Sequence, residues 1–221
     1  MKLTAETLSI LKNYGAINKY LLIDPGHLLQ TSNMSSVLAR TTIQEEFPVE
    51  VILYDLDNFL SVVGMFSQPV LDFRPRFVRI TDEHGEGQVD YIYGSPSAIY
   101  KPLKVPPLPQ KVIEFDLPEQ KWTAIQKAAS VLNKPEVLIL SDGLAVEIST
   151  HDHKYQYTHT FTMPVAADTH GLQCQHILSL ALFKLLKGSY RATVTPRFTV
   201  FQRVGCDMTY WVACDPASTF S

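Results

Sequence analysis

The sequence is poor in the residues and motifs that mark secreted proteins and enzymes. Its three cysteines, Cys174, Cys206 and Cys214, have no paired spacing and give no sign of a disulfide framework. A glycine-rich phosphate loop, a nucleophile elbow and a paired acid and base signature are missing from the sequence. We therefore expect a protein that catalyses no reaction and needs no cofactor.

The chain also lacks a long apolar run and a large net charge. Its most apolar stretch, residues 177–186, is about half as long as a bilayer span and contains Lys184, so we expect no membrane segment. No basic start followed by an apolar run marks an export signal, and a reducing cytoplasm is the expected compartment. With 19 lysines and arginines against 22 acidic residues, the net charge of −3 gives no overall attraction to nucleic acid. A DNA-binding surface would need local segregation of charge.

What the sequence contains is one order of elements that occurs twice. In the first half, Thr4 can cap a helix over about residues 5–16, and Asp55 can cap a second helix through about residue 66. Strands are expected at residues 20–23, 28–30, 49–54, 70–73, 77–82 and 88–93. The Asp-Pro-Gly sequence at residues 24–26 predicts a hairpin turn between the first two.

The second half repeats this order after a connector, Lys101–Lys111, in which four prolines among eleven residues prevent a helix. Asp116 can cap a third helix that runs to about Asn133, and a fourth helix is expected over His176–Lys187, ending at Gly188. Further strands are expected at residues 112–115, 155–163, 190–195, 199–204 and 208–213, with a Ser-Asp-Gly hairpin at residues 141–143. The sequence thus predicts an α+β fold made of two similar halves.

Four segments carry a resemblance to a known family. They are the opening MKLTAETLSILKNYGAINKYLLIDPGHLLQT, the block VILYDLDNFLSVVGMF, the proline-rich connector and the ending YWVACDPASTFS. In order and length the chain resembles the trimeric sliding clamp of tailed bacteriophages, the processivity factor of their replicative DNA polymerase. The resemblance implies two tandem DNA-clamp domains, 1–100 and 112–221, each with two helices against antiparallel sheets, joined by the interdomain connector 101–111.

The resemblance also implies a function and partners. Three subunits would close head to tail into a ring that encircles duplex DNA without sequence specificity and tethers the polymerase for processive synthesis. The implied partners are the phage replicative DNA polymerase, the clamp loader ATPase and the late-transcription factors of RNA polymerase, for which the clamp would be a coactivator. The implied place is the cytoplasm of the infected bacterial host.

Lysines are the candidate DNA-binding residues. A sliding ring cannot read bases and needs diffuse positive charge, which the mobile ammonium group of lysine supplies. We expect the DNA-facing surface to contain Lys12, Lys121, Lys127, Lys134, Lys184 and Lys187. The second helix departs from this pattern, because it exposes Asp57, Asn58 and Ser61 and carries no cation, so each subunit should hold DNA mainly through its second domain. The alternative is that the lysines only keep helix surfaces soluble.

Two further surfaces are expected from the clamp fold. Edge strands can continue the sheet of one subunit into the next, and we expect these strands at Gln88–Tyr93 and Tyr155–Phe161. Their interface side chains would be Val89, Tyr91, Tyr93, Tyr155, Tyr157, His159 and Phe161, which are equally well explained as ordinary half-buried strand residues. The connector residues Leu103, Val105 and Leu108 would bind a partner peptide, or only tie the connector to its domain.

A group of histidines supports one alternative function. An alternating His-x-His on a strand places both rings on one face, so the alternative is a metal-dependent β-rich enzyme that uses His151, His153 and His159. Cys174 and His176 follow in the sequence, but no cysteine or carboxylate completes a recognised metal spacing. The sequence His-Asp-His-Lys is also typical of a polar turn, and we therefore expect no bound metal.

Overall fold

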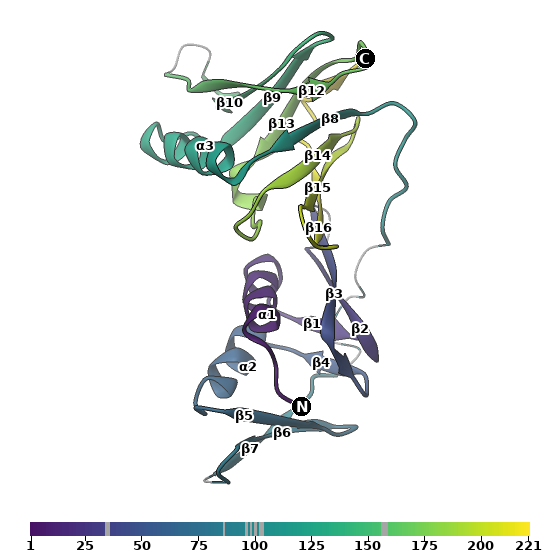
Figure 1. Cartoon of the computed structure of the whole chain (residues 1–221), viewed down its shortest axis with the longest axis vertical. Coiled ribbons are helices and arrows are strands. Elements are labelled where there is room, and N and C mark those ends of the chain that lie inside the picture. The colour runs from purple at the N-terminus through teal and green to yellow at the C-terminus, as the bar shows by residue number, and fades with distance from the viewer. Residues whose placement is uncertain are drawn as a thin grey trace. The chain divides into compact units, whose positions relative to one another are not determined.

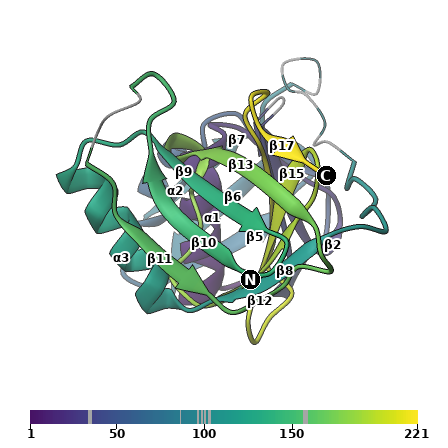
Figure 2. The ribbon, with the colours of Figure 1, turned by 90° about the horizontal axis from the view of Figure 1, so that it is seen from above.

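The computed structural model describes residues 1–33, 36–85, 87–95, 97, 99, 101, 104–155 and 159–221. The chain forms two compact units, one from Met1–Met34 and Leu38–Lys104 and the other from Ser35–Val37 and Val105–Ser221. In each unit, helix packs beside antiparallel strands (Figures 1 and 2), which confirms the predicted α+β class. Within the described ranges, no helix has both the length and the apolar character needed to span a bilayer.

In the part that the structure describes, the first unit contains two α-helices and antiparallel strands. Its elements are α1 (Ala5–Ile17), β1 (Leu21–Ile23), β2 (Gly26–Asn33), β3 (Val37–Phe47), β4 (Val51–Leu53), α2 (Leu56–Val63), β5 (Pro69–Phe73), β6 (Phe77–Asp82) and β7 (Gln88–Ile92). Strand β1 pairs with β4, β2 lies next to β3, and β5, β6 and β7 form an antiparallel sheet in that order. The predicted hairpin at residues 24–26 is wrong, because β1 bonds to β4 and not to β2.

Both helix caps predicted for the first unit are confirmed. Thr4 Oγ1 accepts a hydrogen bond from Thr7 N at 3.2 Å, and Asp55 Oδ1 accepts one from Asn58 N at 2.9 Å. Glu45 of β3 adds a long-range cap, since its carboxylate accepts from Thr4 N at 2.5 Å and from Thr7 Oγ1 at 2.6 Å. Burial acts to raise the pKa of Glu45, but these hydrogen bonds outweigh it and lower the pKa. The start of α1 is therefore fixed to β3.

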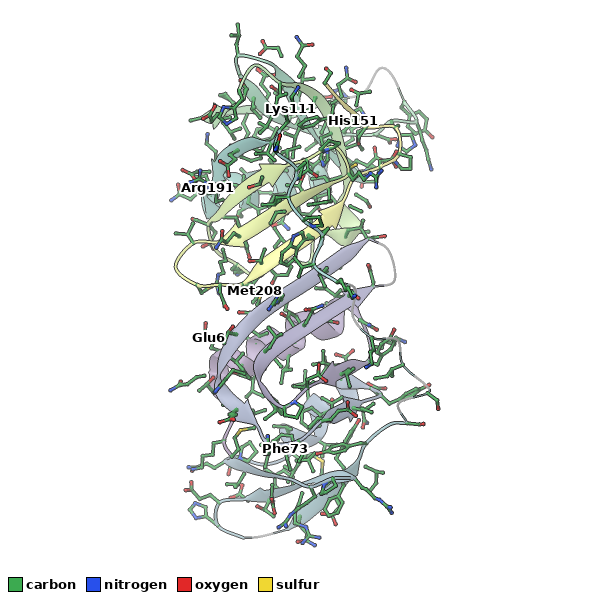
Figure 3. All side chains as sticks on the ribbon, turned by 90° about the vertical axis from the view of Figure 1, so that its right-hand side faces the viewer. Glu6, Phe73, Lys111, His151, Arg191 and Met208 are labelled. Carbon is green, nitrogen blue, oxygen red and sulfur yellow. The ribbon has the colours of Figure 1, made fainter. Side chains whose placement is uncertain are left out.

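The core of the first unit lies between its helices and strands. Tyr14 of α1 and Phe59 of α2 are buried. Phe73, labelled in Figure 3, packs edge-on against Phe47 with ring centroids 5.1 Å apart.

Among its described residues, the second unit contains one α-helix and two sheets. Its elements are β8 (Ile113–Leu117), α3 (Glu119–Val131), β9 (Glu136–Asp142), β10 (Val146–His151), β11 (Thr162–Val165), β12 (Ala167–Asp168), β13 (Gln173–Ser179), the 3-10 turn η2 (Leu180–Leu182), β14 (Tyr190–Val194), β15 (Phe198–Arg203), β16 (Thr209–Ala213) and β17 (Thr219–Phe220). One antiparallel sheet has the order β11-β10-β9-β13-β17, and the strands β12, β8, β14, β15 and β16 are neighbours in the other. Arg191 of β14 is exposed on this second sheet (Figure 3).

The turn between β9 and β10 is the predicted Ser-Asp-Gly hairpin, and it is tied to the turn before β13. Asp142 Oδ1 accepts two backbone hydrogen bonds at 2.8 Å, and Thr169 Oγ1 donates to Gly143 O at 2.5 Å. Gly143 has a φ of +93°, and a Cβ atom there would lie 3.0 Å from the carbonyl oxygen of Gly171. The two turns form one rigid corner, from which Leu144 projects with 90% of its surface exposed.

The predicted fourth helix, His176–Lys187, is wrong. Its first residues belong to β13, which pairs along the whole of β9, and only the short turn η2 follows before irregular chain. The buried ring of Phe183 packs against Trp122 and Phe201, with centroids 4.6 and 5.2 Å apart. The local apolar pattern suits a helix, but strand pairing and this aromatic packing outweigh local propensity.

Three other predictions differ from the structure. Asp116 does not cap α3, because it lies in β8 opposite Arg191, and Pro118 precedes the helix without a side-chain cap. Of the strand expected at residues 155–163, the described residues form strand only at Thr162 and Met163, and Tyr155 N bonds to Asp152 O at 3.3 Å in a turn. The third difference is an omission, because no strand was predicted over Val37–Phe47, where β3 forms.

Candidate functional site

The exposed face of α3 is the strongest candidate for contact with a polyanion. The helix packs on its unit through Trp122 and Ile125, which are buried, and turns Gln120, Thr123 and Lys127 to the surface. The same three exposed side chains line an open groove beside the first turns of the helix. Glu119 lines the same groove, so the positive charge of Lys127 lies near one acidic group. Lys127 and the hydrogen-bond donors of Gln120 and Thr123 can contact phosphates without selecting a base sequence.

The other two lysines predicted for this helix lie in different surroundings. Lys121 is half-buried, and its Nζ donates to the carbonyl oxygen of Pro164 at 2.7 Å. Lys134 is only 8% exposed. It follows Asn133, whose φ of 52° ends the helix, and Lys134 N bonds to Ala129 O at 2.8 Å as in a Schellman cap, which turns the chain away from the helix surface. Lys127 is thus the most exposed of the three.

The other three predicted lysines are all exposed. Lys12 lies on α1, whereas Lys184 and Lys187 lie in the irregular segment before β14 and not on a helix. Their charges are therefore at the surface, but the segment that carries the last two has a different geometry from the one that the sequence predicts.

The helices of the first unit carry little positive charge. On α2 the exposed side chains include Asp57, Asn58 and Ser61, as predicted, and the helix has no basic residue. α1 approaches α2 closely at Gly15, where a Cβ atom would lie 2.8 Å from Asp57 Oδ1. An acidic group therefore lies beside the helix that carries Lys12, and the two units differ in the charge that their helices expose.

Strand β7 is an open edge of its sheet in the part of the chain that the structure describes. Tyr93 N donates to Arg76 O at 3.1 Å, so the backbone groups of every second residue from Tyr93 backwards face β6. The backbone N–H and C=O groups of Gln88, Asp90 and Ile92 therefore face the open edge. A second chain could pair with them there.

The aromatic side chains of β7 face the interior of their own unit. The ring of Tyr91 packs against Phe59 with centroids 5.3 Å apart, and its hydroxyl donates to Asp55 O at 3.0 Å. Tyr93 and Val89 are half-buried on the same side, and burial raises the pKa of Tyr93 to about 12. The outward side chains are those of the alternate residues, of which Ile92 is 67% exposed.

Strand β11 is the second open edge, at one end of its five-stranded sheet within the described residues. The loop before it contains Tyr155 and His159, which are exposed, and Phe161, which is half-buried. Tyr157 lies outside the described residues. Pro164 lies within β11, and a proline is tolerated in a strand where its missing N–H is not needed for pairing, as at an edge.

The connector exposes part of its apolar side chains. Val105 is 37% exposed and Leu108 is 58% exposed, and residues 104–111 form no helix or strand. Leu103 lies outside the described residues. These two side chains could provide anchors for an apolar peptide.

The histidines predicted for a metal site do not form one in the described part of the chain. His153 Nδ1 lies 2.5 Å from Glu136 Oε1, and His153 N donates to Glu136 Oε2 at 3.0 Å, so this residue ties a turn to β9. His151 is at the end of β10 and His159 is exposed in the loop before β11. Among the residues described, no three His, Cys, Asp or Glu side chains come together as metal ligands would.

One buried histidine has a structural setting that the sequence does not reveal. His176 of β13 is fully buried, and its Nε2 lies 2.9 Å from Thr199 Oγ1. Burial lowers the pKa of His176 to about 4, so the ring is neutral at pH 7. Period-two alternation in Gln173–His176 was a signal for this strand.

Comparison with known proteins supports the resemblance stated above. No family model matches the chain. The chain is 24% identical over 224 residues to the sliding clamp of Vibrio phage KVP40, covering 97% of this chain and 99% of that protein. Among solved structures, it is similar to the A. fulgidus PCNA bound to the C-terminal region of FEN-1, with a TM-score of 0.67, 15% identity and 94% of each chain covered.

A second structural match comes from another clamp. The H. pylori beta clamp has a TM-score of 0.69 and 13% identity, covering 96% of this chain and 62% of that one. The expected resemblance is therefore confirmed: the chain is similar to a phage sliding clamp over nearly its whole length, and it has the clamp fold.

Proposed function

We propose that the chain is a ring-forming DNA sliding clamp that encircles duplex DNA and tethers a replicative polymerase for processive synthesis. The observation that carries this proposal is the similarity to a phage sliding clamp along 97% of the chain, together with the clamp fold. The protein would catalyse no reaction and would act by raising the local concentration of polymerase at the primer end. Its domains would be 1–100 and 112–221, with 101–111 as the connector.

Ring closure is assigned to the open edges of β7 and β11. A head-to-tail ring joins two unlike surfaces of each subunit, and three such contacts close a homotrimer. The β7 edge offers the backbone groups of Gln88, Asp90 and Ile92, and the β11 edge offers those of Thr162. Antiparallel pairing of the two would continue one subunit's sheet into the next. Val89, Tyr91 and Tyr93 would then support the β7 edge from behind.

The DNA-facing surface is assigned to the exposed lysines. They are Lys12, Lys127, Lys184 and Lys187. Mobile ammonium groups can move from one phosphate to the next, which suits a protein that slides. Lys121 and Lys134 are left out of this set, because one is bonded to Pro164 and the other is buried.

The partners are assigned to the exposed connector and its surroundings. The similar PCNA is bound to a C-terminal region of another protein, and a peptide with apolar anchors would suit Val105 and Leu108 here. The phage replicative polymerase and the clamp loader ATPase are the partners that this function requires. A role as coactivator of late transcription, through accessory factors of RNA polymerase, follows from the phage resemblance alone.

Primer extension tests the function. With its own polymerase and clamp loader on a singly primed circular template, the protein is expected to lengthen the products. On a short linear template it should lose this effect, because a topological tether slides off a free end. Product lengths that are the same with and without the protein would overturn the proposal.

Two measurements on the purified protein separate the proposal from its alternative. Light scattering is expected to give three subunits, and elemental analysis is expected to give no stoichiometric metal. A monomer at all concentrations would contradict the ring. A stoichiometric metal that His151→Ala removes would favour the metal-dependent enzyme.

A further inference from the structure

The backbone groups on the open edge of β11 belong to two residues. Thr150 N donates to Phe161 O at 2.9 Å, which makes these two residues a hydrogen-bonded pair of the antiparallel ladder. Bonded and non-bonded pairs alternate along such a ladder, so the backbone groups of Thr162 and Pro164 point away from β10. They are the groups that another strand would have to meet.

These two outward positions differ in what they offer. Thr162 has both an N–H and a C=O group on the open side. Pro164 has no N–H, and its carbonyl oxygen accepts a hydrogen bond from Lys121 Nζ at 2.7 Å. An edge carbonyl that is already bonded to an ammonium group is a poor acceptor for an incoming strand. The edge is therefore open at Thr162 and closed at Pro164.

We propose that Lys121 caps the edge of β11 and thereby limits the pairing of this strand with a second copy of the chain to the residues up to Thr162. The proposal rests on the proposed ring, because it takes the edge of β7 as the incoming strand. Without the cap, Pro164 O could accept a hydrogen bond from a backbone N–H of β7, and the paired region could become longer. The pairing could also shift by two residues, because a shift of two leaves each side chain on the same face of the sheet. Lys121 is thus a positioning residue that fixes the register.

The surroundings of Lys121 suit this role. Trp122 and Ile125, its neighbours on α3, are buried, so the helix that carries the ammonium group is held in place. Lys121 is itself half-buried, whereas Lys127 of the same helix is exposed. The two lysines therefore share a helix and a charge but differ in their surroundings, which makes Lys127 the matched control.

The test compares Lys121→Met with Lys127→Met in the full chain. Methionine keeps an unbranched stem and removes the charge, and thermal unfolding checks that both variants are folded. Sedimentation velocity over a range of concentrations then measures subunit association, and amide hydrogen exchange measures protection of residues 88–92 and 159–165. A third measurement, retention on nicked circular DNA at increasing salt, reports binding to phosphates.

We expect only Lys121→Met to change assembly. The dissociation constant between subunits should fall by about three- to tenfold, which is the equivalent of one added backbone hydrogen bond. Species larger than a trimer should also appear. Protection of residues 88–92 should also extend or become heterogeneous. Identical association and exchange in Lys121→Met, Lys127→Met and the unchanged protein would overturn the proposal. So would an equal loss of DNA retention in both variants with assembly unchanged, because Lys121 would then be an ordinary phosphate-binding residue.

The proposal and the ring can fail separately. A monomeric unchanged protein would overturn the ring. In that case Lys121→Met still tests the cap, since an uncovered edge should give concentration-dependent association that Lys127→Met lacks, and its absence would overturn the inference as well.

Discussion

The two units reach similar architectures by different packing. In the first unit two helices, α1 and α2, lie against the strands, and Phe59 of α2 packs on Tyr91 of β7. In the second unit only α3 is a helix among the described residues, and Trp122, Phe183 and Phe201 form a chain of aromatic contacts where a second helix was expected. A sheet can therefore be covered by a few large rings as well as by a helix, because burial of apolar area, and not helix formation, supplies most of the stability.

The units also differ in their buried ionisable groups. The first unit holds the carboxylate of Glu45 over the start of α1, and the second holds the neutral ring of His176 between strands. One group is stabilised in its charged form and the other in its neutral form. Acid should therefore act on the two units over different pH ranges.

The largest expected effect comes from the aromatic contacts that replace a helix. Phe183→Ala should lower the free energy of unfolding by about 3–5 kcal/mol, because a buried ring leaves a cavity. Lys187→Ala, in the same segment but exposed, should change it by less than about 0.5 kcal/mol. Urea denaturation measures both. A small loss for Phe183→Ala would mean that this ring does not replace the packing of a helix.

Acid titration of the second unit should give the next largest effect. His176 has a folded pKa of about 4 against an ordinary value of 6.5, so the unfolded chain binds more protons between these values. The contribution of His176 to the free energy of unfolding is therefore fully present above about pH 6.5 and is lost as the pH drops towards 4. The loss between pH 7 and pH 5 should be about 2 kcal/mol. Denaturant unfolding at several pH values measures this slope.

The control for this prediction is a second histidine. His176→Gln should flatten the slope between pH 7 and pH 5, whereas His84→Gln, at an exposed position, should leave most of it. If both variants keep the full slope, the acid sensitivity has another source.

A smaller effect is expected at the helix cap of the first unit. Glu45→Gln keeps the shape and one acceptor but loses the charge, and it should cost about 1 kcal/mol at pH 7. Because the pKa of Glu45 is lowered below its ordinary value of 4.5, its contribution is present above that pH and is lost as the pH falls through the folded pKa. Glu46→Gln is the exposed control. Equal unfolding curves for the two variants would contradict the role of the cap.

The smallest effect on stability, and a specific one on DNA, is expected for the surface lysines. Lys127→Glu and Lys12→Glu should each leave unfolding unchanged within about 0.5 kcal/mol. Lys127→Glu should weaken the salt dependence of DNA binding, because fewer counterions are released. The slope of log K against log salt concentration should become smaller by about one for each phosphate contact that is lost. Lys12→Glu, on a helix beside Asp57, should reduce it less. If both variants reduce the salt dependence equally, the helices of the two units do not differ in their contact with DNA.

Much of the fold could be predicted from local sequence. The caps at Thr4 and Asp55, the three helices and the hairpin at residues 141–143 were recognised because their signals lie within a few residues of one another. The helix predicted over His176–Lys187 failed, since its apolar spacing suits a helix while its pairing partner, β9, is distant in the sequence. Local helix propensity does not include the hydrogen bonds to a strand that is distant in the sequence.

The candidate surfaces were harder to predict, because they depend on which way the chain turns. Lys134 has the spacing of a helix-face residue, yet the positive φ of Asn133 takes it off that face. The strand β7 was predicted at nearly its observed bounds, but the direction of its backbone groups follows only from the register with β6. The hydrogen bond between Lys121 and Pro164 joins residues 43 positions apart and has no local signal.

The corner at the tip of β9 and β10 is a suitable site for attaching a spectroscopic probe. Leu144 projects from two turns that hold each other through Gly143 and Thr169, so a group attached at position 144 would not swing freely. With the exposed Cys206 replaced by serine, a fluorescent dye on Leu144→Cys would follow the tumbling of the whole second unit. Its anisotropy could report rotation along a DNA groove in single molecules.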